Sequence, residues 1–129
     1  MGLDQCAFSS EKPLDDDDVV EPKYYWRKHA KLQEFMSNLY HYFGYHQKSV
    51  HTDRDDFNCN PMLLDETAID GLEKALKNEA LPESPGGFFF GDEFQDESAS
   101  EYKEQDLEFC EWARKEIKAN RHVYYDCWW

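Results

Sequence analysis

Residues 104–129, EQDLEFCEWARKEIKANRHVYYDCWW, contain a helical pattern followed directly by a strand pattern. In the first part, apolar side chains recur at the spacing of one helix face, at Leu107, Cys110, Ala113 and Ile117. The segment from His122 to Trp129 is rich in aromatic residues, which favour β-strands. We therefore expect the longest helix of the chain to lead into a closing strand.

The beginning of the chain divides into an acidic segment and an amphipathic helix. Residues 1–22 carry the run Asp15–Asp18 and few adjacent aliphatic residues, and because like charges repel a compact arrangement, we expect an acidic, mobile arm. Apolar residues between Leu32 and Phe43 share one helix face, which predicts a helix over about residues 29–43. We expect residues 23–129 to form a single domain.

The middle of the chain predicts one more helix and two short strands. The run Met62–Leu64 predicts a strand that leads into a helix, because Asp65 to Thr67 offer side-chain oxygens to the free amides of a helix start. That helix should end before Pro82, whose ring excludes the helical conformation from the preceding residue. The triplet Phe88–Phe90, bracketed by glycines, predicts a short buried strand.

The predicted elements point to a fold class. Three short strands that alternate with three helices are accommodated most economically by an α+β fold, or by a small α/β fold, because each element buries its apolar side against a neighbour. We therefore expect a small sheet packed against helices. The pattern leaves the strand order and the strand directions open.

Composition limits the classes of function. The chain has 129 residues, enough for one domain, and its 28 acidic residues against 14 basic ones give a formal charge of −14. This charge disfavours direct binding to nucleic acid or to an anionic membrane, and it favours a basic partner or a surface that imitates nucleic acid. The aromatic content of 16 % is high enough for a real core.

The sequence also predicts a soluble, cytoplasmic protein. Its first twenty residues show no basic start followed by an apolar run, and nothing approaches the roughly 18 apolar residues that a membrane span requires. The four cysteines lie far apart in the sequence, which favours reduced thiols over a zinc site or a redox pair; they are Cys6, Cys59, Cys110 and Cys127.

Patterns for catalysis and for metal binding are weak. A phosphate-binding loop needs a lysine next to its glycines, but the glycines of residues 86–91 have none nearby and are followed by acidic residues. Three histidines between residues 41 and 51 lie near acidic residues without the spacing of a known metal site. We assign no catalytic residue, metal or cofactor, and we expect Cys110 and Cys127 to pack in the core.

The strongest candidate for a functional surface is acidic. Seven acidic residues fall in residues 1–22 and nine in residues 92–111, which together hold 16 of the 28. Solvation explains many such runs, but a dense negative field also steers basic partners. The aromatic and basic cluster before the first helix is a second candidate surface, although such aromatics commonly fold back on the core. The candidate partner-binding residues are Asp96, Glu97, Glu101, Glu104, Glu108 and Glu111, with Tyr25, Trp26 and Arg27.

Several segments together resemble a group of small, poorly characterised bacteriophage proteins. The resemblance covers roughly residues 24–129 and is carried by Tyr24–His29, Leu32, Met36, Phe57–Cys59, Gly87–Gly91, Val123–Asp126 and Trp128–Trp129. The glycine-bracketed Phe triplet and the terminal tryptophan doublet are its most specific elements. The resemblance implies a viral accessory protein in the cytoplasm of an infected cell, and it carries over no catalytic residue.

Two functions from different classes follow. The first is a non-enzymatic protein that binds a basic host or defence protein through its acidic face, or imitates nucleic acid there. The alternative is a small enzyme or ligand-binding module with an aromatic pocket around Phe88–Phe90 and Trp128–Trp129, where a histidine or cysteine would react.

Overall fold

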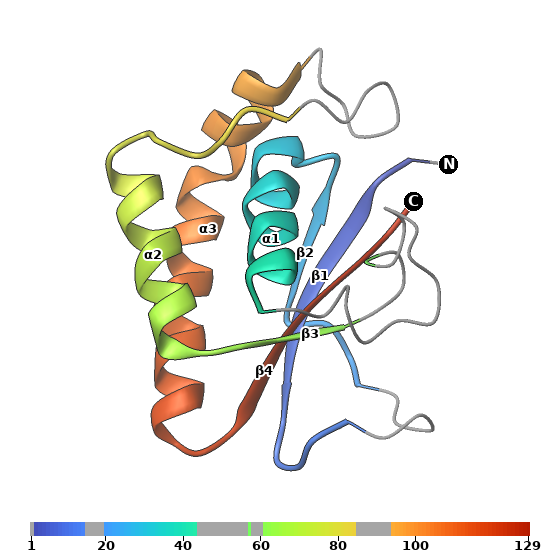
Figure 1. Ribbon diagram of the computed structural model, residues 1–129, viewed down its shortest axis with the longest axis vertical. Coiled ribbons are helices and arrows are strands. Elements are labelled where there is room, and N and C mark those ends of the chain that lie inside the picture. Colours follow the sequence, from blue (N-terminus) through green and yellow to red (C-terminus); the bar gives the residue numbers. More distant parts are fainter. Residues whose placement is uncertain (1, 15–19, 44–56, 58–60, 85–93) are drawn as a thin grey trace.

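Three helices cover one face of a four-stranded antiparallel sheet in the computed structural model, which describes residues 2–14, 20–43, 57, 61–84 and 94–129 (Figure 1). The strand order is β2-β1-β4-β3. In chain order the elements are β1 (Asp4–Ser10), β2 (Tyr24–Arg27), α1 (Ala30–Tyr42), β3 (Met62–Leu64), α2 (Glu66–Lys77), α3 (Gln95–Lys118) and β4 (His122–Trp128). The predicted α+β class is confirmed, but the described residues hold four strands where three were predicted.

The prediction of an acidic arm over residues 1–22 is wrong for residues 4–10. They form β1, which lies in the interior of the sheet and pairs with β2 on one side and with β4 on the other. Its register with β4 brings Ala7 opposite Tyr125. Pairing between strands so far apart in the sequence leaves no pattern within residues 4–10 that could reveal it. The prediction therefore followed the acidic residues of this segment. The acidic run at residues 15–18 lies outside the described residues.

The two faces of the sheet differ in how they are covered. Alternate side chains, such as Leu3, Trp26 and Tyr125, point to the helices and are fully buried in the main core. On the opposite face a smaller cluster forms from Cys6, Phe8 and Tyr124, with Leu14 and Val20 packed against it. Residues 14 and 20 of the expected arm therefore also contact the sheet.

The helices match the predictions closely where they are described. Asp65 caps α2 as predicted, because its side chain accepts a hydrogen bond from the backbone N–H of Ala68 at 2.7 Å. Helix α2 ends at Lys77, before Pro82 as expected. Residues 88–90, where a strand was predicted, lie outside the described residues.

Both α2 and α3 end in the same hydrogen-bonded motif. After α2, Glu79 adopts a left-handed conformation with φ of 52°, and the N–H of Ala80 donates to the carbonyl oxygen of Ala75 at 2.8 Å. After α3, Asn120 adopts φ of 63°, and the N–H of Arg121 donates to the carbonyl oxygen of Glu116. Glycine or asparagine is the usual residue at this position, so Glu79 is strained there.

Candidate functional site

Five glutamates form one exposed line along α3. They follow one another at intervals of four, three, four and three residues, which returns each to the same side of the helix. From the first to the last, the helix rises about 21 Å at about 1.5 Å per residue. We call this set the acidic stripe; its members are Glu97, Glu101, Glu104, Glu108 and Glu111, and all are exposed.

The carboxylates of the acidic stripe form no ion pair within the described residues. Acidic residues on the neighbouring surfaces do. Arg114 of α3 binds Asp70 and Glu73 of α2 at 2.7 and 3.2 Å. Asp96, which the sequence grouped with the stripe, is paired with Lys31 at 2.6 Å. In the part of the chain that the structure describes, the stripe is therefore a line of exposed carboxylates outside any ion pair.

Side chains of α3 occupy part of the edge of β2. The Gln105 side chain donates to the carbonyl oxygen of Tyr25 at 2.8 Å, and the backbone N–H of Arg27 donates to the Tyr102 hydroxyl at 3.2 Å. An open sheet edge is a template for pairing with another chain, and these two bonds cover part of it. They also bring Tyr25 and Arg27, each about half exposed, beside α3.

The negative charge of the stripe also affects a side chain of β2. Burial raises the pKa of Tyr24, and the charges of Glu108 and Glu111 add to the rise. The two candidate surfaces of the sequence analysis, the acidic one and the aromatic one, are thus neighbours in the fold. The backbones of Tyr25 and Arg27 lie beside α3, whereas their side chains are on the face of the sheet opposite the helices, as the pairing of Tyr25 with Cys6 shows.

Trp26 is not part of this surface. Its side chain is fully buried and packs edge-on against Phe109, with the ring centroids 5.4 Å apart. Including Trp26 among the partner-binding residues is therefore a mistake, and the alternative that the aromatics fold back on the core holds for this residue. The cause is strand alternation, which turns Trp26 inward and its neighbours Tyr25 and Arg27 to the other face.

The core contains a group of hydrogen-bonded polar side chains that the sequence analysis missed. At its centre Asp106 accepts a hydrogen bond from the Trp26 indole N–H at 2.7 Å. The other oxygen of Asp106 lies 2.7 Å from Nε2 of His29, and both side chains are fully buried. The His29 ring stacks on Tyr102 at 5.2 Å, and its Nδ1 has no hydrogen-bond partner among the described residues.

The same group continues across the sheet. Gln5 accepts a hydrogen bond from the backbone N–H of His29 at 2.9 Å and donates to the Tyr125 hydroxyl at 2.8 Å. That hydroxyl donates to Gln33 at 2.6 Å. We call these six residues the buried polar network: Gln5, Trp26, His29, Gln33, Asp106 and Tyr125. The network joins β1, β2, α1, α3 and β4.

This network is closed to substrates. An aspartate–histidine pair is typical of hydrolytic sites, but a catalytic pair needs a nucleophile and access for the reacting molecule. His29, Asp106 and Tyr125 have no exposed surface. The geometry therefore fits a structural role, in which the network connects helices and strands, better than a catalytic role.

Two of the described thiols are also poor nucleophiles. Burial, with smaller contributions from nearby carboxylates, raises the pKa of Cys6 and that of Cys110 to about 12. Cys110 and Cys127 are fully buried, as predicted from the pattern. In the described part of the chain, no group of three or more histidine, cysteine or acidic side chains is arranged to hold a metal ion.

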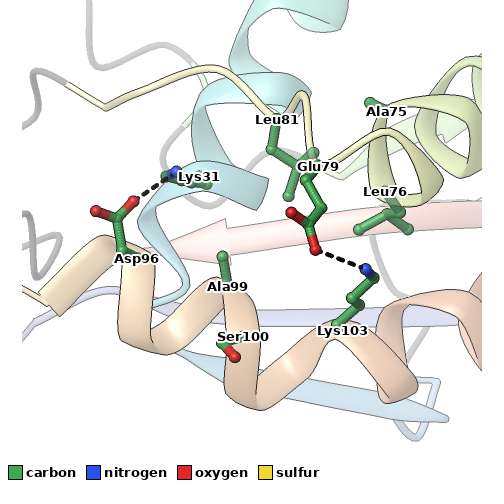
Figure 2. Close-up of a pocket in the computed structure, with 9 residues that line it drawn as sticks. All are labelled: Lys31, Ala75, Leu76, Glu79, Leu81, Asp96, Ala99, Ser100 and Lys103. Carbon is green, nitrogen blue, oxygen red and sulfur yellow. Dashed lines mark hydrogen bonds and ion pairs between the residues drawn. The ribbon is translucent and has the colours of Figure 1, made fainter.

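A pocket of about 320 Å³ lies where the three helices meet (Figure 2). It is not the aromatic pocket of the alternative function. The terminal residues Trp128 and Trp129 do not line it, and residues 88–90 lie outside the described residues. The lining residues are Lys31, Ala75, Leu76, Glu79, Leu81, Asp96, Ala99, Ser100 and Lys103.

Comparison with known proteins leaves the family open: no family model, no curated protein and no solved structure matches the chain. Among the described residues, no helix is both long enough and apolar enough to cross a membrane. The arrangement of the described side chains is therefore the basis for a functional proposal.

Proposed function

We propose that this protein acts by binding a basic protein partner through the acidic stripe of α3. The observation that carries the proposal is the alignment of five exposed carboxylates, none of which forms an ion pair within the described residues. The resemblance to small phage proteins supplies the setting, an infected bacterial cell with a host or defence protein as the partner.

The stripe has a cost that supports a role in binding. Successive members of the stripe form four like-charge pairs, three or four residues apart on the helix. Each such pair destabilises a helix by roughly 0.2–0.5 kcal/mol. The four pairs together cost about 1–2 kcal/mol. Solubility is served by a formal charge of −14 wherever the charges lie, so it gives no reason to align them.

The spacing of the carboxylates fits a basic protein segment better than it imitates the phosphates of a nucleic acid. Five carboxylates over about 21 Å correspond to one charge per roughly 5 Å, whereas duplex DNA carries one per about 1.7 Å. The stripe alone thus has about a third of the linear charge of a duplex. A basic helix or strand, whose lysines and arginines recur at similar intervals, is the better match.

Tyr25 and Arg27 form a second candidate surface on β2. Interfaces are enriched in tyrosine and arginine, which combine apolar area with hydrogen bonding. Their backbones contact α3, whereas their side chains lie on the face of the sheet opposite the helices. We expect the carboxylates to steer the partner, and these two side chains to slow its dissociation where it reaches around the edge of β2.

The proposal is tested by capture from bacterial lysate on three immobilised forms of the protein. They are the original chain, a stripe variant with Glu101, Glu104, Glu108 and Glu111 changed to Gln, and a control variant with Glu11, Glu21, Glu66 and Glu83 changed to Gln. Each variant changes the formal charge from −14 to −10, so the two are matched in net charge.

We expect a basic protein to be retained by the original chain and by the control variant, and lost from the stripe variant. Equal retention on both variants would mean that net charge, and not the stripe, attracts it. Release of the captured protein by duplex DNA would show that the stripe occupies a nucleic-acid site on the partner.

A further inference from the structure

The pocket at the meeting of the three helices is built from two lysines around an apolar floor. Ala75 and Leu76 come from α2, Ala99 from α3, and Leu81 from the loop after α2 (Figure 2). A volume of about 320 Å³ equals about ten water molecules at roughly 30 Å³ each, and it lies at the small end of ligand sites.

The two lysines of the pocket are less exposed than the carboxylates with which they pair. Lys31 is paired with Asp96 at 2.6 Å, and Lys103 with Glu79 at 3.2 Å. The lysine side chains are 17 % and 39 % exposed, whereas those carboxylates are 85 % and 80 % exposed. The cations are thus the sheltered members of both pairs. An incoming anion can replace the carboxylates, because exposed ion pairs are weak and the acids can turn into water.

The loop that carries Leu81 is anchored to the start of α3 by hydrogen bonds. The Gln95 side chain accepts from the backbone N–H of Ser84 at 2.8 Å and donates to its carbonyl oxygen at 3.4 Å. Glu79 holds its left-handed conformation at the pocket, where glycine would be unstrained. Strained residues of this kind concentrate at ligand sites.

We propose that this pocket binds a small monoanion carried on a short apolar chain, such as a medium-chain carboxylate. The anionic head pairs with Lys31 and Lys103, and the apolar chain packs on Ala75, Leu76 and Leu81. This site is separate from the acidic stripe, so the two proposals stand or fall independently. Charge-assisted hydrogen bonds to the more buried lysine contribute more of the affinity.

The test is a titration followed by the backbone amide signals in ¹H–¹⁵N NMR spectra. The probes are hexanoate, acetate, which lacks the chain, and hexylamine, which reverses the charge. Hexanoate should shift signals of the pocket residues, such as Ala75, Ala99 and Lys103, and should bind at least about tenfold more tightly than the other two.

Lysine variants assign the charge. Lys31→Met keeps an apolar stem and should weaken hexanoate binding about tenfold, whereas Lys103→Met should weaken it roughly threefold because its ammonium is more exposed. The matched control is Lys115→Met, an exposed position on α3 outside the pocket, which should leave the affinity unchanged.

Three results would overturn the proposal. Shifts confined to residues outside the pocket would place the site elsewhere, and equal binding of hexylamine would remove the anion preference. An equal loss of affinity in all three lysine variants would assign the effect to net charge alone. Unfolding is separated from binding because the spectrum of each variant reports its fold before ligand is added.

Discussion

Replacing Asp106 by Ala should destabilise the fold far more than any exposed acidic substitution. The carboxylate of Asp106 is fully buried and is hydrogen-bonded to both Trp26 and His29 at 2.7 Å. Its removal leaves two buried nitrogen groups unsatisfied, at roughly 1–3 kcal/mol each, or about 2–6 kcal/mol together. We therefore expect a loss of about 3–5 kcal/mol in the free energy of unfolding.

Urea denaturation followed by circular dichroism measures this loss, with thermal unfolding as a second readout. For a domain of this size, 1 kcal/mol shifts the melting temperature by roughly 3–5 °C, so the expected decrease is about 10–25 °C. The control is Glu108→Ala, an exposed position on the same helix, whose effect should stay within about 0.5 kcal/mol. A change of less than about 1 kcal/mol for Asp106→Ala would refute the role assigned to the network.

Three further predictions concern the termini, the end of α2 and the sheet. Deleting residues 1–10 removes the interior strand β1, so the truncated chain should lose its cooperative thermal transition; a retained transition would contradict the topology. Glu79→Gly relieves a left-handed conformation and should raise stability by about 1 kcal/mol in urea denaturation, whereas no gain would mean that Glu79 is not strained there. Burial raises the pKa of Asp126 above its ordinary value of 3.8, so the ionised carboxylate disfavours the folded state at neutral pH. Asp126→Asn should therefore raise the free energy of unfolding at pH 7, and this gain should vanish below pH 3.8, where the carboxyl is neutral in both states. Urea denaturation across this pH range measures the gain, and an equal gain at pH 7 and pH 3 would contradict the assignment.

The helices could be predicted from the sequence because their signals are local. The spacing of Leu107, Cys110 and Ala113 lies within two turns of α3, and Asp65 caps a helix that begins at the next residue. The acidic stripe was accessible for the same reason, since its members recur every three or four residues on one helix. Local spacing thus predicted the element and the face.

The parts that were missed depend on contacts between distant residues. β1 is polar at both ends, and its pairing with β4 joins residues more than a hundred positions apart. The burial of Trp26 depends on Asp106, 80 residues later, which reads as an ordinary acid in an acidic helix. The pocket gathers residues from three helices and a loop, so no single segment carries a signal for it.

The most direct test of the acidic stripe is the association rate with a captured basic partner, measured at several ionic strengths. The Debye length decreases from about 30 Å at 0.01 M to about 8 Å at 0.15 M, so steering by the stripe should be strongest at low salt. We predict that the stripe variant associates about tenfold more slowly than the original chain at low salt and has a flatter salt dependence, while the control variant of equal net charge behaves like the original chain. Equal rates and equal salt slopes for the two variants would contradict the account.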